Sequence, residues 1–199
     1  MGWREDGHLV VRGVLDVATV AGLAARCDAM PGDVIRTAAL DLDPVLRAIA
    51  DDPRLTAIAG DVLGGQPLAF GATFLVKPAR TGLPAHWHQD GHPWRERGIT
   101  EAVTLWVALD AATVETGCLR VIPGSHGLEL QPLVPVGDAP SMFGGGIDPA
   151  LVDESRAVDV ELEPGDVSVH HSALVHGSGP NATERQRRAL ALRYRRAEG

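Results

Sequence analysis

Hydrophobic residues in the first third of the chain recur mostly at helical spacing. The expected elements are a short strand at 8–11, a helix at 17–30 and a helical stretch from about 44 to 63. Asp16 is a suitable N-cap for the first helix, because its carboxylate can accept hydrogen bonds from the free N–H groups of the first turn. Pro53 is expected to divide the second stretch, since proline lacks the N–H that a helix interior needs. Residues 1–66 are therefore predicted to form a mainly helical support.

From Pro67 onward the pattern changes to short alternating runs separated by turn signals. The expected strands are 68–77, 103–109, 118–122, 159–162, 167–176 and 189–195. Residues 131–155 break this pattern with prolines and three consecutive glycines, which indicates a long irregular loop that serves as a lid. Helices followed by many short strands predict a mainly β single domain over 1–199, with a jelly-roll or barrel core at 67–199.

The size and charge of the chain narrow the possible partners. Its 199 residues fit one domain, and its net charge of −8 argues against nucleic acid as the main partner. An acidic chain is compatible with a cationic small substrate, although such a charge also serves solubility. No apolar run reaches the ~18 residues of a membrane span, and the first residues, MGWREDGHLV, lack the apolar stretch of a signal peptide. We therefore expect a cytoplasmic protein that acts on a small molecule and has no membrane partner.

The segment 84–94, PAHWHQDGHPW, concentrates residues that can bind metal. Its candidate ligands are His86, His88, Asp90 and His92. In an extended strand, residues i and i+2 project to the same face, so His88 and Asp90 can bind one ion. A third ligand must come from elsewhere, and spacing alone does not choose among His170, His171 and His176. Two histidines and one carboxylate with open positions form the facial triad of non-haem Fe(II) oxygenases.

Several segments match the motifs of a known family. They are FLVKP at 74–78, WHQD at 87–90, TGCLRVIPGSH at 116–126, and GDVSVHHSALVHGSGPN followed by RRALALRY within 165–194. With these motifs in this order, the chain resembles the phytanoyl-CoA dioxygenase-like Fe(II)/2-oxoglutarate oxygenases. The resemblance implies a double-stranded β-helix, a cupin-like jelly roll, that uses Fe(II), 2-oxoglutarate and O2. It also implies His88, Asp90 and His176 as the catalytic iron ligands, because the distal histidine of the family opens the HGS motif.

The resemblance further assigns residues to the co-substrate. In the family, an arginine eleven positions after the distal histidine grips the far carboxylate of 2-oxoglutarate, and here that position is Arg187. A planar guanidinium can hold a carboxylate through two hydrogen bonds. Ala189 and Ala191 share a strand face with Arg187, and their small side chains leave room for a ligand. The other matching positions that line this pocket in the family are Ser178, Trp106 and Lys77.

The sequence defines the substrate less closely than the co-substrate. Residues that flank the metal or lie in the lid are expected to contact the substrate, namely Gln89, His92, Trp94, Met142 and Phe143. The short chain leaves little room for a large acyl-CoA. We therefore expect a bacterial dioxygenase of specialised-metabolite or antibiotic biosynthesis that hydroxylates or oxidatively cyclises a small polar metabolite and releases succinate and CO2.

Two other interpretations of the metal-binding motifs stay open. A cupin-like dioxygenase would bind metal through His86, His88 and His176 and would need no 2-oxoglutarate. A non-catalytic jelly roll would bind a ligand or a structural metal without turnover. The sequence does not indicate the oligomeric state.

Overall fold

Two antiparallel sheets face one another, and helices cover the outer side of the larger sheet. The computed structural model describes residues 2–137 and 140–197. Its α-helices are α1 (Trp3–Asp6), α2 (Val17–Ala29), α3 (Pro44–Ala50), α4 (Pro53–Leu63) and α5 (His92–Arg95). Its strands are β1 (His8–Val11), β2 (Ile35–Ala38), β3 (Pro67–Lys77), β4 (Ala85–His88), β5 (Ala102–Ala108), β6 (Leu119–Val121), β7 (Val158–Val160), β8 (Val167–His171), β9 (His176–Ser178) and β10 (Arg187–Arg196).

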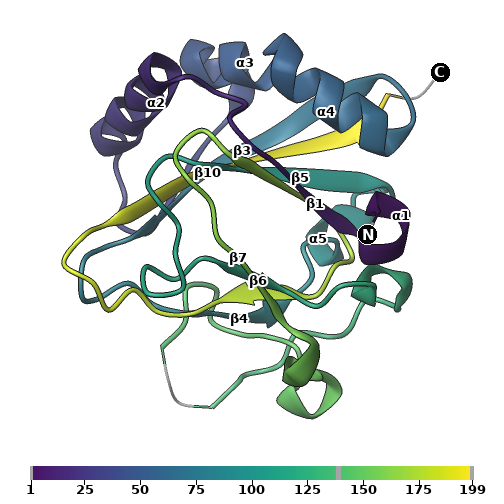
Figure 1. Ribbon diagram of the computed structural model, residues 1–199. Helices are drawn as coiled ribbons and strands as arrows, with labels where there is room; N and C mark the ends of the chain where they lie inside the picture. The colour runs from purple at the N-terminus through teal and green to yellow at the C-terminus, as the bar shows by residue number, and fades with distance from the viewer. Residues whose placement is uncertain (1, 138–139, 198–199) are drawn as a thin grey trace.

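The order of the strands is that of a jelly roll. The larger sheet has six strands in the order β1-β8-β5-β10-β3-β2, and the smaller has four in the order β4-β9-β6-β7. In Figure 1 the helices α2, α3 and α4 lie over β3, β5 and β10, while β4, β6 and β7 lie on the opposite side. The mainly β fold with N-terminal helices and a double-stranded β-helix core, as the sequence predicts, is confirmed.

The helices begin where the sequence places their caps. The Asp16 carboxylate accepts a hydrogen bond from the Thr19 N–H at the start of α2, and Asp43 and Asp52 cap α3 and α4 in the same way. Pro53 begins α4, so the long helical stretch is divided at the predicted residue. The apolar faces of these helices cover the outer face of the larger sheet, where Leu46, Leu55, Phe74, Leu105 and Leu190 are all fully buried.

Strand β10 separates two apolar layers by simple alternation. Leu190, Leu192 and Tyr194 point toward the helices, and the Tyr194 hydroxyl donates a 2.8 Å hydrogen bond to the carbonyl oxygen of Ala50. Ala189 and Ala191 point the other way, into the layer between the two sheets. Arg187 has the same parity as these alanines and therefore faces the inside of the jelly roll.

The predicted strand at 167–176 is wrong in one respect. It is two strands, β8 and β9, which belong to different sheets and are joined by a turn at residues 172–175. His170 and His176 therefore face the same interior from opposite sheets, whereas His171 faces outward, toward Trp3 and His126. Strands β2 and β4 and the short helix α1 are absent from the predicted set.

The segment predicted to be a lid is irregular where the structure describes it. Within 131–137 and 140–155 the regular elements are 3-10 turns at Pro149–Leu151 and Glu154–Arg156, the second of which ends one residue beyond the predicted range. Val134 and Gly146 form an isolated bridge that closes a loop carrying Met142 and Phe143. Within the described ranges, no helix is both long enough and apolar enough to cross a membrane.

Candidate metal and co-substrate site

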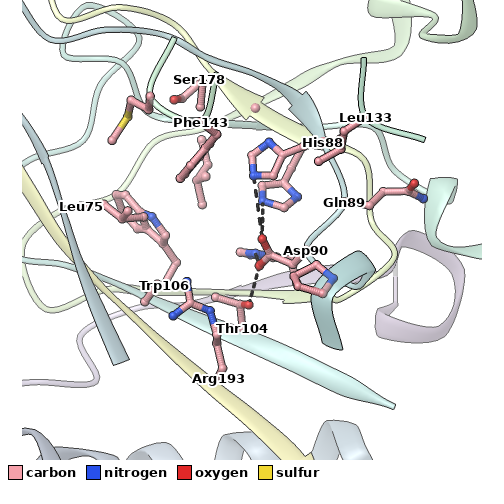
Figure 2. Close-up of a pocket in the computed structure, with 18 of the residues that line it drawn as sticks. Leu75, His88, Gln89, Asp90, Thr104, Trp106, Leu133, Phe143, Ser178 and Arg193 are labelled. Carbon is pink, nitrogen blue, oxygen red and sulfur yellow. Dashed lines mark hydrogen bonds and ion pairs between the residues drawn. The ribbon is translucent and has the colours of Figure 1, made fainter. Parts of the chain in front are cut away.

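Strand pairing brings two histidines together at one end of the smaller sheet. His88 ends β4 and His176 begins β9, and the two residues are direct partners in the antiparallel pairing. Their ring centroids are 4.2 Å apart. Asp90 lies in the turn just after β4 rather than within a strand, and its Oδ1 is 3.8 Å from the Nε2 atom of each histidine. Two sheet-held imidazoles and one carboxylate thus converge on a single point. Figure 2 shows the His88 ring and the Asp90 carboxylate pointing toward one another.

Backbone carbonyl groups fix which nitrogen each histidine offers. The Nδ1 atom of His88 lies 2.7 Å from the carbonyl oxygen of His86, and that of His176 lies 2.9 Å from the carbonyl oxygen of Leu174. Because a carbonyl oxygen can only accept, each Nδ1 carries the proton, and each Nε2 presents its lone pair to the cluster. Burial, as the main cause, lowers the pKa of both histidines to about 4, so both are neutral at pH 7. The neutral imidazole is the form that binds metal.

The Asp90 carboxylate is held by residues of the larger sheet. Thr104 of β5 donates a 2.9 Å hydrogen bond to its Oδ2, and the Nε2 atom of His170 on β8 is 3.6 Å from the same oxygen. Burial alone would raise the pKa of Asp90. In the acid range where Asp90 would take up a proton, the contact with His170 and the positive charges of the then protonated imidazoles outweigh burial, and they hold that pKa well below its usual range. Asp90 is therefore an anion whose orientation is set from outside the cluster.

This donor set fits a ferrous ion. One ligand atom from each of His88, Asp90 and His176 lies within 4.8 Å of the other two. In the part of the chain that the structure describes, no other group of three or more such residues comes this close, and His86 is not a member of the cluster. The cluster consequently has the composition of a two-histidine, one-carboxylate triad and not that of a three-histidine cupin site.

Arg187 is a buried cation that has no anionic partner among the described residues. Its side chain is 2% exposed, and only Nη2 forms a hydrogen bond, 3.1 Å to the carbonyl oxygen of Gly117. Nε and Nη1 have no partner among the residues that the structure describes. Burial lowers the pKa of Arg187 to about 10, which still leaves it charged at pH 7. An isolated charge inside a protein is costly unless a counter-charge compensates it.

The residues around Arg187 shape a compartment for such a counter-charge. The indole of Trp106 lies against the guanidinium, with Cζ 5.2 Å from the ring centroid. Ser178, two residues after His176, lines the same cavity as Arg187 and Trp106. Gly117 has a φ of +77°, and a Cβ there would lie 2.5 Å from the carbonyl oxygen of Gly179, so the turn that aims its carbonyl at Arg187 needs glycine.

A single cavity, here called the inner cavity, joins the metal cluster to Arg187. Its volume is about 200 Å³, and its lining includes His88, Asp90 and His176 at one end and Arg187, Trp106 and Ser178 at the other. Met142 and Phe143 of the irregular loop also line it, and the Phe143 ring centroid is 4.9 Å from that of His88. The loop therefore covers the metal side of the cavity, as Figure 2 shows for Phe143.

The remaining residues predicted to bind co-substrate or substrate lie outside the inner cavity or have their polar groups paired with the backbone. Lys77 is fully buried beside Arg187 but is outside the cavity lining, because its ammonium donates to the carbonyl oxygens of Leu83 and Gly179. Gln89 lines the cavity, yet its amide donates 2.7 Å to the carbonyl of Ala173 and accepts from the N–H of Gln131 at 2.8 Å. His92 contacts the carbonyl oxygen of Gln131, away from the cavity. Trp94 lines a neighbouring cleft.

Thr104 and Arg193 were not singled out as site residues from the sequence, and His170 was considered there only as a candidate third metal ligand. Thr104 and His170 orient Asp90, and Arg193 lines the inner cavity from β10. Strand parity was the available signal, because Thr104 shares a face with Trp106, and Arg193 shares one with Arg187. The position of His170 beside Asp90 depends on the break between β8 and β9, which the sequence did not reveal.

Comparison with known families agrees with this geometry. A family model described as "Phytanoyl-CoA dioxygenase (PhyH)" matches residues 3–189. Phytanoyl-CoA dioxygenase domain-containing protein 1 of Bos taurus is 29% identical over 161 residues, which cover 79% of this chain and 55% of that protein. A probable phytanoyl-CoA dioxygenase of Caenorhabditis elegans is 32% identical over 164 residues, covering 76% and 51%. The chain spans about half the length of these curated relatives.

Solved structures share both the fold and most of the chain length. EvdO2 from Micromonospora carbonacea var. aurantiaca, complexed with 2-oxoglutarate, is 27% identical with a TM-score of 0.80 over 98% of this chain and 88% of that chain. The epimerase SnoN, in complex with Fe3+, alpha ketoglutarate and nogalamycin RO, is 27% identical with a TM-score of 0.76 over 98% and 81%. The chain belongs to the phytanoyl-CoA dioxygenase family, which confirms the family resemblance that the motifs indicated.

Proposed function

We propose that this chain is an Fe(II)- and 2-oxoglutarate-dependent dioxygenase that oxidises a small polar metabolite, by hydroxylation or oxidative cyclisation, in bacterial specialised-metabolite biosynthesis. The single observation that carries the proposal is the buried, unpartnered guanidinium of Arg187 in the same cavity as the cluster of His88, Asp90 and His176. A dicarboxylate that also chelates the metal satisfies both ends of this cavity at once. A structural metal site would give no reason to bury Arg187.

Each residue has a defined part in holding the two groups. His88, Asp90 and His176 would hold iron, with Thr104 and His170 fixing the direction of the Asp90 carboxylate. Arg187 would hold the far carboxylate of 2-oxoglutarate, Ser178 would add a hydroxyl, and the Trp106 ring would keep water away from the guanidinium. When bound, iron and 2-oxoglutarate supply the oxidising chemistry: O2 is consumed, succinate and CO2 are released, and the substrate is oxidised.

The similar structures favour tailoring of natural products over lipid metabolism. SnoN and the carbocyclase SnoK come from nogalamycin biosynthesis, and SnoK is 25% identical to this chain with a TM-score of 0.76. Their names include an epimerase and a carbocyclase, so one fold and cofactor pair serve different outcomes. The mass of the product separates these outcomes, because hydroxylation adds one oxygen atom, cyclisation removes two hydrogens, and epimerisation changes nothing.

An anaerobic titration tests the cofactor pair directly. Apo-protein would receive Fe(II) and then 2-oxoglutarate, and the visible charge-transfer band of an iron-chelated keto acid would be recorded. We expect the band in the wild type, no band in Asp90→Ala, and a band that needs far more 2-oxoglutarate in Arg187→Gln. Bound iron without any band would contradict the proposal and favour a 2-oxoglutarate-independent dioxygenase or a non-catalytic ligand-binding jelly roll.

A further inference from the structure

A second cavity, here called the outer cleft, adjoins the metal from the side away from Arg187. Its volume is about 460 Å³, and it shares Asp90, Pro93 and Arg193 with the inner cavity. Phe70 and Trp94 form an aromatic wall, with ring centroids 5.3 Å apart in an edge-to-face arrangement. A molecule in the outer cleft would therefore lie against the metal cluster without displacing a ligand from the Arg187 end.

Two arginines face the outer cleft with donor groups to spare. Arg193 is half-buried, with its Cζ 5.9 Å from the Trp94 ring centroid, and its Nη1 donates a 2.7 Å hydrogen bond to the Thr73 hydroxyl. Among residues 2–137 and 140–197 this is the only hydrogen bond of its guanidinium, which has five N–H donors. Arg97 is exposed, and its guanidinium has no hydrogen-bond or ion-pair partner in those same ranges.

The charges of the two cavities do not balance without a further anion. In the inner cavity a divalent iron and Arg187 would offset Asp90 and the two carboxylates of 2-oxoglutarate. Among the described residues that line the outer cleft, Asp90 is the only carboxylate, and the proposed function already uses it to hold the metal. Glu101 lies with Arg97 along an adjoining hollow, together with Arg196, so that hollow is not acidic overall. Among the described residues, Arg97 and Arg193 thus have no carboxylate as an ion-pair partner, although the net charge of the chain is −8.

We propose that the outer cleft is the substrate site and that it selects a small metabolite carrying an anionic group, a carboxylate or a phosphate, next to an apolar or aromatic part. The anion would bind Arg97 and Arg193, and the apolar part would pack on Phe70 and Trp94, which leaves the remainder of the molecule beside Asp90 and the metal. This inference rests on the proposed function. It replaces the cationic substrate that the net charge suggested, because the local charge at the site has the opposite sign to the charge of the whole chain.

The test uses simple probes whose charge differs while their ring is the same. Wild-type protein would be saturated with Ni(II) and 2-oxoglutarate, which fills the Arg187 end without turnover. Benzoate, phenyl phosphate, benzyl alcohol and benzylammonium would then be titrated, with binding followed by ligand-observed NMR. We expect both anions to bind at least five-fold more tightly than the neutral and cationic probes. The stronger of the two anions indicates whether a carboxylate or a phosphate is the natural group.

Matched variants localise the binding. We expect Arg97→Gln and Arg193→Gln each to weaken anion binding at least five-fold, while Arg193→Lys keeps most of it. Arg95→Gln, which removes the same charge from an exposed residue of α5 outside the cleft, should bind anions like the wild type. Arg97 is exposed, so its variant tests the proposal even if changes at Arg193 disturb folding.

The result that would overturn the inference is specific to the outer cleft. Equal binding of all four probes, no binding of either anion, or anion binding that Arg97→Gln leaves unchanged would each rule it out. The binding of 2-oxoglutarate is measured first on the same samples. Normal 2-oxoglutarate binding with failed anion selection rejects the substrate class alone, whereas absent 2-oxoglutarate binding rejects the proposed function.

Discussion

The two ends of the site are built from different parts of the fold. At the co-substrate end, Arg187, Trp106 and Ser178 lie on β10, β5 and β9, and Arg187 and Trp106 are almost fully buried. At the proposed substrate end, the exposed Arg97 follows the short helix α5, although Phe70 and Arg193 of the same cleft lie on β3 and β10. Strands held on both sides fix side chains closely, whereas loops can change without disturbing the core.

This contrast separates the binding of a co-substrate that many oxygenases share from the binding of a substrate that is particular to one enzyme. A co-substrate common to many oxygenases needs one unchanging geometry, and the paired strands provide it. A substrate differs from enzyme to enzyme, and the outer cleft proposed to bind it combines Phe70 and Arg193 from paired strands with Arg97 from a segment outside the sheets. We therefore expect changes at the co-substrate end to abolish chemistry and changes at the substrate end to alter affinity and access.

Of the changes considered, Asp90→Ala is expected to reduce turnover most. Asp90 borders both the inner cavity and the outer cleft, so it serves both ends of the site. Removing this carboxylate takes one of the three ligands and leaves two neutral imidazoles. We expect turnover to fall by roughly a thousandfold or more, which corresponds to about 4 kcal/mol. Metal analysis of the purified variant should show little bound iron.

A milder change, made to the residue that orients the Asp90 carboxylate, provides the control. Thr104→Val keeps Asp90 but removes the 2.9 Å hydrogen bond that orients it. Loss of such a supporting contact typically costs about 10- to 100-fold in metal affinity. If Asp90→Ala retained stoichiometric iron and normal turnover, the assignment of the cluster would be wrong.

The next largest effect concerns the affinity for 2-oxoglutarate alone. Arg187→Gln removes the buried charge and is expected to raise the Kd for 2-oxoglutarate by roughly 30- to 5,000-fold, since breaking a buried charge pair costs about 2–5 kcal/mol. Titration of the charge-transfer band measures this Kd. Its neighbour Arg188 lies on the opposite face, where it pairs with Asp110 and Asp28.

Arg188→Gln is therefore a charge-matched control for Arg187→Gln. It should lower stability without changing the Kd for 2-oxoglutarate by more than about two-fold, because its partners lie outside both cavities. Equal effects of the two changes would mean that general charge, and not the position of Arg187, determines co-substrate binding.

The sequence indicated the co-substrate end far better than the substrate end. The H-x-D spacing indicated His88 and Asp90, although Asp90 lies in a turn just after β4. The family resemblance, through the HGS motif and the arginine eleven positions later, indicated His176 and Arg187, and alternation added only that Arg187 shares a strand face with Ala189 and Ala191. The break between β8 and β9 escaped detection because the turn at 172–175 contains no glycine or proline.

Arg97 illustrates why the substrate end could not be predicted. It lies among charged residues after α5, and such a run is typical of a solvated surface. The role proposed for Arg97 comes only from the fold, which places it on the lining of the same cleft as Phe70 and Arg193. Trp94 was expected beside the substrate for its nearness in sequence to the metal, and the structure places it on the wall of the outer cleft.

The pKa of Lys77, which is buried beside Arg187, can be examined through the pH dependence of protein stability. Burial, together with the charge of Arg187, lowers the pKa of Lys77 to about 7. In the unfolded chain lysine titrates near 10.5, so between pH 7 and 10.5 the unfolded state binds more protons and stability rises with pH. The contribution is at most about 1.4 kcal/mol per pH unit.

The comparison of Lys77→Met with the wild type measures this contribution. Urea unfolding between pH 7 and 9 should give a free energy of unfolding that rises more steeply in the wild type than in the variant. The variant also loses the hydrogen bonds to Leu83 and Gly179, at a cost of roughly 1–3 kcal/mol. Parallel pH profiles would show that Lys77 has an ordinary pKa and lies in a wetter environment.

The smallest effect is expected at the loop that covers the metal. Phe143 is 45% exposed, and its ring centroid is 4.9 Å from that of His88, so it shields the cluster without belonging to the core. Phe143→Ala should change the free energy of unfolding by less than about 1 kcal/mol and speed removal of the metal by a chelator about two- to five-fold. Leu151→Ala, which truncates another exposed apolar residue, 61% exposed and outside the cavity lining, should leave the rate unchanged. Equal rates in both variants would mean that the loop does not limit access, whereas a large loss of stability in Phe143→Ala would place this residue with the strand-built end of the site.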